Sequence, residues 1–167
     1  MGVCLVYPPF FNEAVHNVPP IGLLRLAAYL EAREVAVDVI DFIYEINAGE
    51  LGICPTLLDT CAERILARGQ TVVGFSTQCT TLSPAIGIAE RVKSFDSSVT
   101  IVFGGYGASF ESERLLRTFD AIDVLVRGEG ECSLHELVLA LEHGRPLDSV
   151  DGLLYRCSET HEVKATA

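Results

Sequence analysis

The chain of 167 residues has little positive charge. Its 12 lysines and arginines stand against 23 aspartates and glutamates, a formal net charge of −11 at pH 7. A phosphate-backbone partner requires a basic face, so we expect no nucleic-acid partner. The sequence also lacks a membrane-length apolar run and a basic leader with a cleavage site. We therefore expect a cytoplasmic protein with no membrane partner.

The six cysteines lack the spacing of a metal motif. They stand at positions 4, 54, 61, 79, 132 and 157, so none forms a C-x-x-C zinc motif or a clustered iron–sulfur motif. Most lie within apolar runs, in a chain long enough to fold without disulfide bridges. We expect buried, unbridged thiols.

Short apolar segments alternate with helical patterns along the chain. The expected strands cover residues 3–7, 35–42, 72–76, 100–103 and 122–127, with another at 152–156. The expected helices cover residues 21–33, 57–67, 84–95, 111–118 and 132–143.

Strands that are apolar on both sides and alternate with helices predict a parallel sheet covered on both faces. The predicted fold class is α/β, a flavodoxin-like doubly wound five-stranded parallel sheet in the order 2-1-3-4-5. We expect one domain over residues 1–157. Residues 158–167 are expected to start an interdomain linker or form a tail.

Ligands of a doubly wound sheet bind beyond the carboxyl ends of its strands. Four unusual loops are predicted to meet there, at residues 8–20, 77–83, 104–110 and 128–131. They carry aromatic residues between two Pro-Pro pairs, a hydroxyl-rich run, a Gly-Gly pair, and glutamates between glycines. Helix caps and turns explain each loop separately, but their coincidence at one rim predicts a ligand site.

Several common ligands fit this rim poorly. A phosphoacceptor receiver domain needs acids after the first and third strands and a lysine after the fifth, where this chain has Tyr7, Ser76 and Arg127. A dinucleotide-binding fold needs G-x-G-x-x-G after the first strand, and Gly104-Gly105-Tyr106-Gly107 has neither that place nor that spacing. FMN requires a hydroxyl-rich phosphate loop after the first strand, where this chain has prolines and phenylalanines, but it stays open as an alternative.

The order of motifs resembles the cobalamin-binding domain at the amino terminus of cobalamin-dependent radical S-adenosylmethionine proteins. The resemblance covers residues 3–156 and rests on Pro8-Pro9, Pro19-Pro20 followed by IGLLRLAAYL, and the segments VVGFS, VFGGYGASF and VRGEGE. In the wider cobalamin-binding fold, a Ser/Thr after the third strand and a Gly-Gly after the fourth line a slot for the nucleotide tail. Ser76, Thr77, Gly104 and Gly105 match those positions.

That resemblance implies a purpose for the glycine pair. A side chain added at Gly105 fills the slot, so Gly105→Val is expected to abolish cobalamin binding and leave the chain soluble, unless φ is positive there.

The chain departs from the family pattern at two places. Related cobalamin domains carry D-x-H-x-x-G after the first strand, whose histidine ligates cobalt, whereas around His16 this chain has Ala14 and Pro19 at the Asp and Gly positions. The resemblance therefore implies a His-off state, with the tail outside the cobalt coordination sphere. Tyr106-Gly107 stands where relatives often have Pro-His, which leaves the retention of the cofactor open.

The candidate cofactor-binding residues follow the rim, and none of them is a catalytic or metal-ligating residue. They are Pro9, Asn12, Ser76, Thr77, Gln78, Thr80, Gly104, Gly105, Tyr106, Gly107, Gly128, Glu129 and Gly130.

The chain has no C-x-x-x-C-x-x-C motif. The resemblance therefore assigns S-adenosylmethionine and the [4Fe–4S] cluster to a radical catalytic domain, in cis or in trans. It implies that this chain is a cobalamin-binding module, not catalytic alone, of an enzyme for methyl transfer or related radical chemistry on an unknown substrate. The alternative is a degenerate domain that acts as an interaction scaffold and binds no corrinoid.

Overall fold

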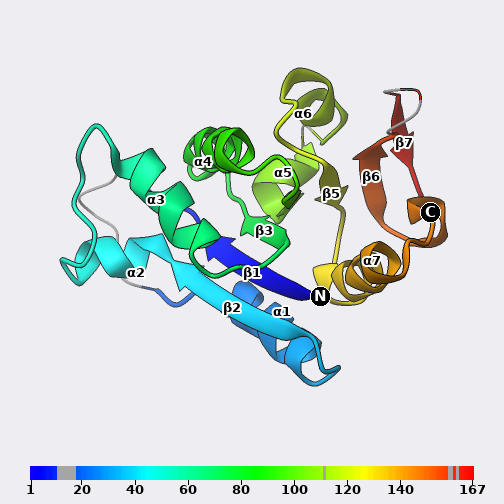
Figure 1. The fold of residues 1–167 in the computed structure, drawn as a ribbon, viewed down its shortest axis with the longest axis horizontal. Helices are drawn as coiled ribbons and strands as arrows, with labels where there is room; N and C mark the ends of the chain where they lie inside the picture. The colour runs from blue at the N-terminus through cyan, green and yellow to red at the C-terminus, as the bar shows by residue number, and fades with distance from the viewer. Residues whose placement is uncertain (11–17, 111, 158–159, 161) are drawn as a thin grey trace.

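The computed structural model describes the chain except for residues 11–17, 111, 158–159 and 161. Within the described residues, a seven-stranded sheet carries helices on both faces (Figure 1). The strands are β1 (Gly2–Tyr7), β2 (Ala36–Asp41), β3 (Val72–Ser76), β4 (Thr100–Gly104), β5 (Val124–Val126), β6 (Leu153–Arg156) and β7 (Val163–Ala165). The helices are α1 (Ile21–Glu31), α2 (Phe42–Asn47), α3 (Leu57–Leu66), α4 (Leu82–Phe95), α5 (Tyr106–Phe110), α6 (Ser112–Thr118) and α7 (Gly130–His143), with the 3-10 helix η1 (Leu147–Ser149).

The strand order is β2-β1-β3-β4-β5-β6-β7. The first five strands in this order pair in parallel, whereas β6 and β7 are each antiparallel to the neighbour before them. The predicted α/β, doubly wound class is confirmed. The strand predicted at 152–156 is present as β6, but β6 and β7 both join the sheet, so the prediction of a five-stranded sheet is wrong. Strand β7 lies within the segment 158–167 that we expected to be a linker or tail, so residues 163–165 belong to the sheet.

The sheet separates two hydrophobic cores. Helices α1 and α7 cover one face, and α3, α4, α5 and α6 cover the other (Figure 1). Because strand side chains alternate between faces, Val72 and Gly74 of β3 lie under α1 and α7, whereas Val73 and Phe75 point to the opposite core. That opposite core is filled by large side chains.

Two short helices were not expected from the sequence. Helix α2 directly follows β2, because the Asp41 carboxylate accepts a hydrogen bond from the Tyr44 N–H at 2.9 Å and caps the helix. Helix α5 begins immediately after Gly105, in a stretch that we predicted to be a loop. The predicted end of α7 at Gly144 is confirmed, since this residue takes the left-handed conformation with φ 62°.

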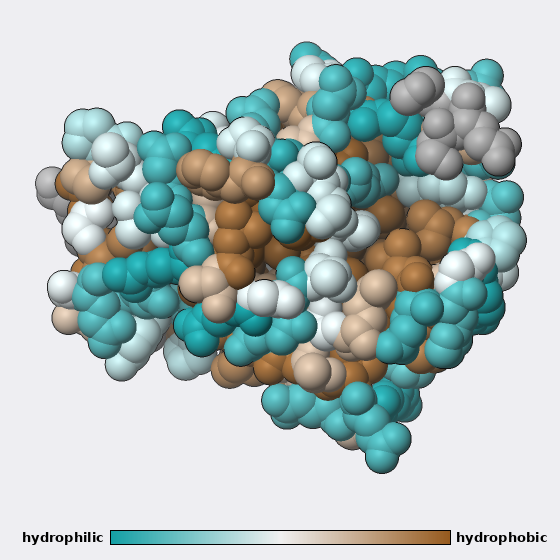
Figure 2. Space-filling view, viewed as in Figure 1, coloured by the Kyte–Doolittle hydropathy of each residue, from teal (hydrophilic) through white to brown (hydrophobic). Residues whose placement is uncertain are grey.

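Hydrophobic residues are not confined to the interior. Figure 2 shows hydrophobic side chains mainly in the middle of the visible face, with hydrophilic residues around its outline. Ile21 at the start of α1 and Tyr106 at the start of α5 are both exposed, and each follows the rim formed by the strand carboxyl ends. No helix of the described residues is long and apolar enough to cross a membrane.

The cysteines differ in burial. Cys4 and Cys61 are buried and unbridged, and burial is the main cause that raises the pKa of both thiols to about 12. Cys54, Cys79 and Cys132 are also unbridged but exposed. The expectation of buried thiols is therefore wrong for these three, whose chain positions at loops and helix starts give them access to water.

We expect a thiol-alkylating reagent at about pH 8 to modify the three exposed cysteines quickly, and Cys4 and Cys61 only after unfolding. Thiols with raised pKa values and no solvent access supply little reactive thiolate. Timed labelling with peptide mass spectrometry measures the order, and labelling in urea is the control. Fast native labelling of Cys4 contradicts the burial of β1.

Candidate functional site

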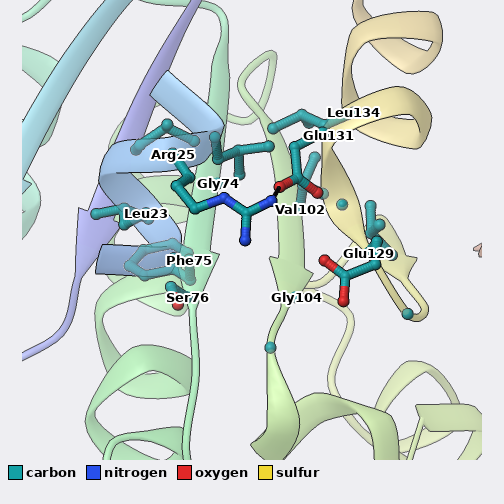
Figure 3. A pocket seen from close by; sticks show the side chains of 17 residues that line it. Leu23, Arg25, Gly74, Phe75, Ser76, Val102, Gly104, Glu129, Glu131 and Leu134 are labelled. Atoms are coloured by element: carbon teal, nitrogen blue, oxygen red, sulfur yellow. Dashed lines mark ion pairs between the residues drawn. The ribbon is translucent and has the colours of Figure 1, made fainter. Parts of the chain in front are cut away.

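A pocket of about 200 Å³ lies between α1 and α7, over the carboxyl-terminal halves of β1, β3, β4 and β5 (Figure 3). This is the rim at which the sequence predicted a ligand site. Six of the 17 lining residues are glycines, which keep side chains out of the space: Gly22, Gly74, Gly104, Gly105, Gly128 and Gly130.

The sheet forms the floor of the pocket. Gly74 of β3 is the register partner of Val102 of β4, and Ser76 is the partner of Gly104 at the strand ends. An added Cβ at Gly104 would have no neighbour closer than the Val126 carbonyl oxygen at 3.9 Å. Strand glycines often mark places where another group approaches the backbone. At Gly74 that group is the Leu5 side chain, whose Cδ2 atom would lie 3.1 Å from an added Cβ, whereas Gly104 leaves free space over β4.

The walls come from the first turns of two helices. Leu23 and Leu26 of α1 stand opposite Leu134 of α7, so the walls are apolar. Gly22 and Gly130 place the starts of the same helices at the pocket, and neither helix is capped by the side chain of its N-cap residue. The positive ends of two helix dipoles therefore meet at this site.

One ion pair joins the two walls. Arg25 of α1 reaches toward Glu131 of α7, with 3.2 Å between its guanidinium nitrogen and the carboxylate oxygen (Figure 3). The Arg25 side chain is 71% exposed and that of Glu131 is 19% exposed. Because the Arg25 side chain is mostly exposed, solvent screens this ion pair, and exposed pairs contribute only about 0–1 kcal/mol.

Thr77 holds the rim together instead of lining the pocket. Its side chain is buried, and both its hydroxyl (2.9 Å) and its backbone N–H (2.8 Å) donate to the Gly104 carbonyl oxygen. These hydrogen bonds tie the end of β3 to the end of β4. Thr77 therefore positions Gly104.

Gly105 and Gly107 are required by backbone packing. Gly105 has φ 88°, and a Cβ there would lie 2.6 Å from the Thr77 carbonyl oxygen. A Cβ at Gly107 would lie 2.6 Å from the Gln78 carbonyl carbon. The expectation that Gly105→Val leaves the fold intact is therefore corrected, because its stated exception, a positive φ, applies.

The remaining candidates lie elsewhere. Gln78, Thr80 and Tyr106 line, with Cys79, a second and more open hollow of about 430 Å³. Pro9 is buried and lines neither hollow. Asn12 and His16 lie outside the described residues.

Thus six of the predicted site residues gather in the first pocket, namely Ser76, Gly104, Gly105, Gly128, Glu129 and Gly130. Sequence reasoning missed the α1 wall, the ion pair and Gly74. Gly74 carried a usable signal, because a glycine inside an apolar strand indicates a close approach. The segment IGLLRLAAYL, which forms the α1 wall, contributed to the resemblance, but only the folded chain shows that α1 lies beside α7.

Residues 9–138 match the family model of the B12 binding domain, so the chain belongs to that family. An uncharacterised methyltransferase of Pyrococcus horikoshii is 32% identical over 162 residues. An anaerobic magnesium-protoporphyrin IX monomethyl ester cyclase of Rubrivivax gelatinosus is 30% identical over 177 residues. These alignments cover 93% and 100% of this chain but only 33% and 30% of the two relatives, so the chain spans about a third of their length.

Two solved structures have the same fold. The cobalamin-dependent S-adenosylmethionine radical enzyme OxsB with aqua-cobalamin bound superposes with a TM-score of 0.83 at 22% identity, over 99% of this chain and 22% of that enzyme. The radical S-adenosylmethionine methyltransferase TsrM of Kitasatospora setae, with cobalamin and a [4Fe–4S] cluster bound, gives 0.73 at 23% identity, over 95% and 30%. The sheet and its covering helices thus share the fold of a part of each of these two enzymes.

We expect Gly105→Ala to lower the free energy of unfolding by about 1 kcal/mol or more, because the new Cβ meets the Thr77 backbone at a positive φ. Thermal and urea melts of the variant without ligand measure the change. Gly104→Ala is the matched control: its φ is not positive and its Cβ enters free space. Equal stability of the two variants contradicts the assignment of Gly105 to backbone packing.

Proposed function

We propose that this chain binds cobalamin with the nucleotide tail in the pocket between α1 and α7, as the cofactor-binding part of a radical S-adenosylmethionine enzyme. The observation that carries the proposal is the glycine-lined pocket at the rim of a B12-binding fold. An interaction scaffold without a corrinoid would not require such a cavity. Family membership likewise leaves FMN without support.

The size of the pocket fits a part of a cofactor. Pockets for whole small-molecule ligands measure roughly 300–1,000 Å³, and this pocket measures about 200 Å³. Such a space suits a planar base on a ribose, attached to a larger ring that stays outside. The free space at Gly22 and Gly104, where a Cβ meets nothing closer than 3.9 Å, is a cradle that ordinary side chains would fill.

The charges at the pocket suit the rest of the tail. A nucleotide tail carries one phosphodiester anion, and helix N-termini bind such groups through their N–H donors and dipoles. We assign this role to the starts of α1 and α7, with Arg25 leaving Glu131 to pair with the phosphate. The Glu129 carboxylate, also in the lining, is a suitable acceptor for ribose hydroxyls.

The second hollow suits the corrin periphery. Gln78 and Thr80 carry polar groups that can bond amide arms, and the exposed Tyr106 ring offers a flat apolar contact. Thr77, Gly105 and Gly107 act through the backbone that they position. Pro9 and Asn12 stay predictions.

We further propose that no protein histidine ligates cobalt. The His16 loop lacks the Asp and Gly of the ligating motif, and the described histidines His135 and His143 are both on α7 and outside the pocket. Bound at this site, cobalamin would supply methyl transfer or related radical chemistry. The names of the relatives, a methyltransferase and a cyclase, support a catalytic domain with S-adenosylmethionine and a [4Fe–4S] cluster in the rest of the protein.

We expect Gly104→Val to weaken cobalamin binding at least tenfold, because the isopropyl group enters the pocket where the tail would lie. Incubation with hydroxocobalamin, desalting and a visible spectrum give the retained corrinoid, and titration gives the Kd.

Gly52→Val is the matched control, since a Cβ at Gly52 meets nothing within 4 Å and Gly52 is not in the pocket lining. It is expected to retain wild-type binding. Unchanged binding by a folded Gly104→Val chain would mean that the tail lies elsewhere. No retention by the wild type would support the scaffold.

We expect His16→Ala to leave the visible spectrum of bound cobalamin unchanged, because the Ala14 and Pro19 positions lack the groups that orient a ligating histidine. The measurement compares the spectra of the two proteins at equal occupancy. A shifted corrin band in the variant would show that His16 is a cobalt ligand.

A further inference from the structure

The pocket between α1 and α7 separates apolar from charged side chains. Leu5, Val102 and Leu134 are each at most 3% exposed and surround its deep part. The charged residues are more accessible, with the Arg25–Glu131 pair bridging the walls and Glu129 at the end of β5 (Figure 3).

The deep part offers a base almost no hydrogen-bonding side chain. Ser76 is the one uncharged polar side chain among the lining residues that the structure describes. It pairs in register with Gly104 at the strand ends, whereas the deeper register pair is Gly74 and Val102. The backbone groups of these central strands are engaged in the sheet ladder. A polar ring edge in this part of the pocket would therefore lose its bonds to water without replacement.

The nucleotide tails of corrinoids differ in the polarity of the ring edge of their base. A dimethylbenzimidazole presents two methyl groups and carbon–hydrogen edges, whereas an adenine presents an exocyclic amine and further ring nitrogens. Burying an unpaired polar group is costly, and burying methyl groups is favourable. An apolar floor therefore binds the two bases with different affinities, because only the adenine loses hydrogen bonds to water.

We infer that this site selects corrinoids by their lower base, accepting a benzimidazole and rejecting a purine. Leu5, Val102 and Leu134 are the specificity-determining residues, and the glycines beside them admit the ring. The inference rests on the proposed function, since it requires the tail to occupy this pocket.

The test uses the whole chain and three probes: cobalamin, the corresponding adenine-containing corrinoid, and cobinamide, which has no nucleotide tail. We expect cobalamin to bind most tightly and the adenine form about tenfold or more weakly, as one unpaired polar group predicts. Cobinamide is expected to bind weakly, because it leaves the pocket unfilled. Equilibrium titrations followed by absorbance give the three Kd values.

A pair of variants tests the floor itself. Val102→Thr puts a hydroxyl of nearly the same shape into the pocket and is expected to reduce the preference for cobalamin over the adenine form several-fold. Val73→Thr is the matched control, because Val73 is equally buried in the neighbouring strand but faces the opposite core. It is expected to leave the ratio of the two Kd values unchanged.

The outcomes separate this inference from the proposed function. Equal binding of cobalamin and the adenine form overturns the selection and leaves the proposed function intact. Equal binding of cobalamin and cobinamide overturns both the selection and the proposed placement of the tail in this pocket, and leaves only corrinoid binding. Binding of none of the probes overturns both. If Val102→Thr does not fold, the wild-type comparison alone decides. If both variants change the ratio equally, Val102 has no specific role.

Discussion

The site depends on an unequal distribution of side-chain size across two central strands. On one face, Phe75 and Phe103 meet with ring centroids 5.2 Å apart and fill the core under α3 and α4. On the other face the same strands present Gly74 and Gly104. Because alternating residues point to opposite faces, β3 and β4 can be firmly packed from one side while a space stays open on the other. The cavity therefore lies over a sheet that is well packed on its other face.

The rim next to this cavity is fixed by backbone contacts. Thr77 donates two hydrogen bonds to the Gly104 carbonyl, and α5 packs so closely on residues 77 and 78 that Gly105 and Gly107 have no room for a side chain. The glycines of this run therefore have two structural roles. Gly104 leaves free space above the sheet, and Gly105 and Gly107 let α5 approach the β3–α4 connection. The sequence alone does not distinguish these two roles, whereas the φ angle of each glycine and the atoms nearest to an added Cβ do.

Much of the fold was predictable because it depends on local patterns. Apolar runs predicted the parallel strands, and Gly144 predicted the end of α7. Helix α2 was not predicted because its N-cap residue, Asp41, lies within a strand-like pattern. Strand β7 was not predicted because it pairs antiparallel with β6 and no helix connects the two strands. At the site, the loops at the strand ends were predictable from the winding rule. The Arg25–Glu131 pair was not, since these residues are about a hundred positions apart and meet only in the folded chain.

The polarity of the pocket follows from the same architecture. Its deep part lies over strands whose backbone groups are hydrogen-bonded within the sheet. The polarity of this part therefore depends on side chains alone, and these are aliphatic. Its upper part lies at two helix starts, where N–H groups and dipoles favour an anion. A ligand that is apolar at one end and anionic in the middle satisfies both parts, and a nucleotide with an apolar base has this form. The chain is strongly acidic, with net charge −11, so Arg25 and the two helix starts are local features that attract an anion against a repulsive overall field.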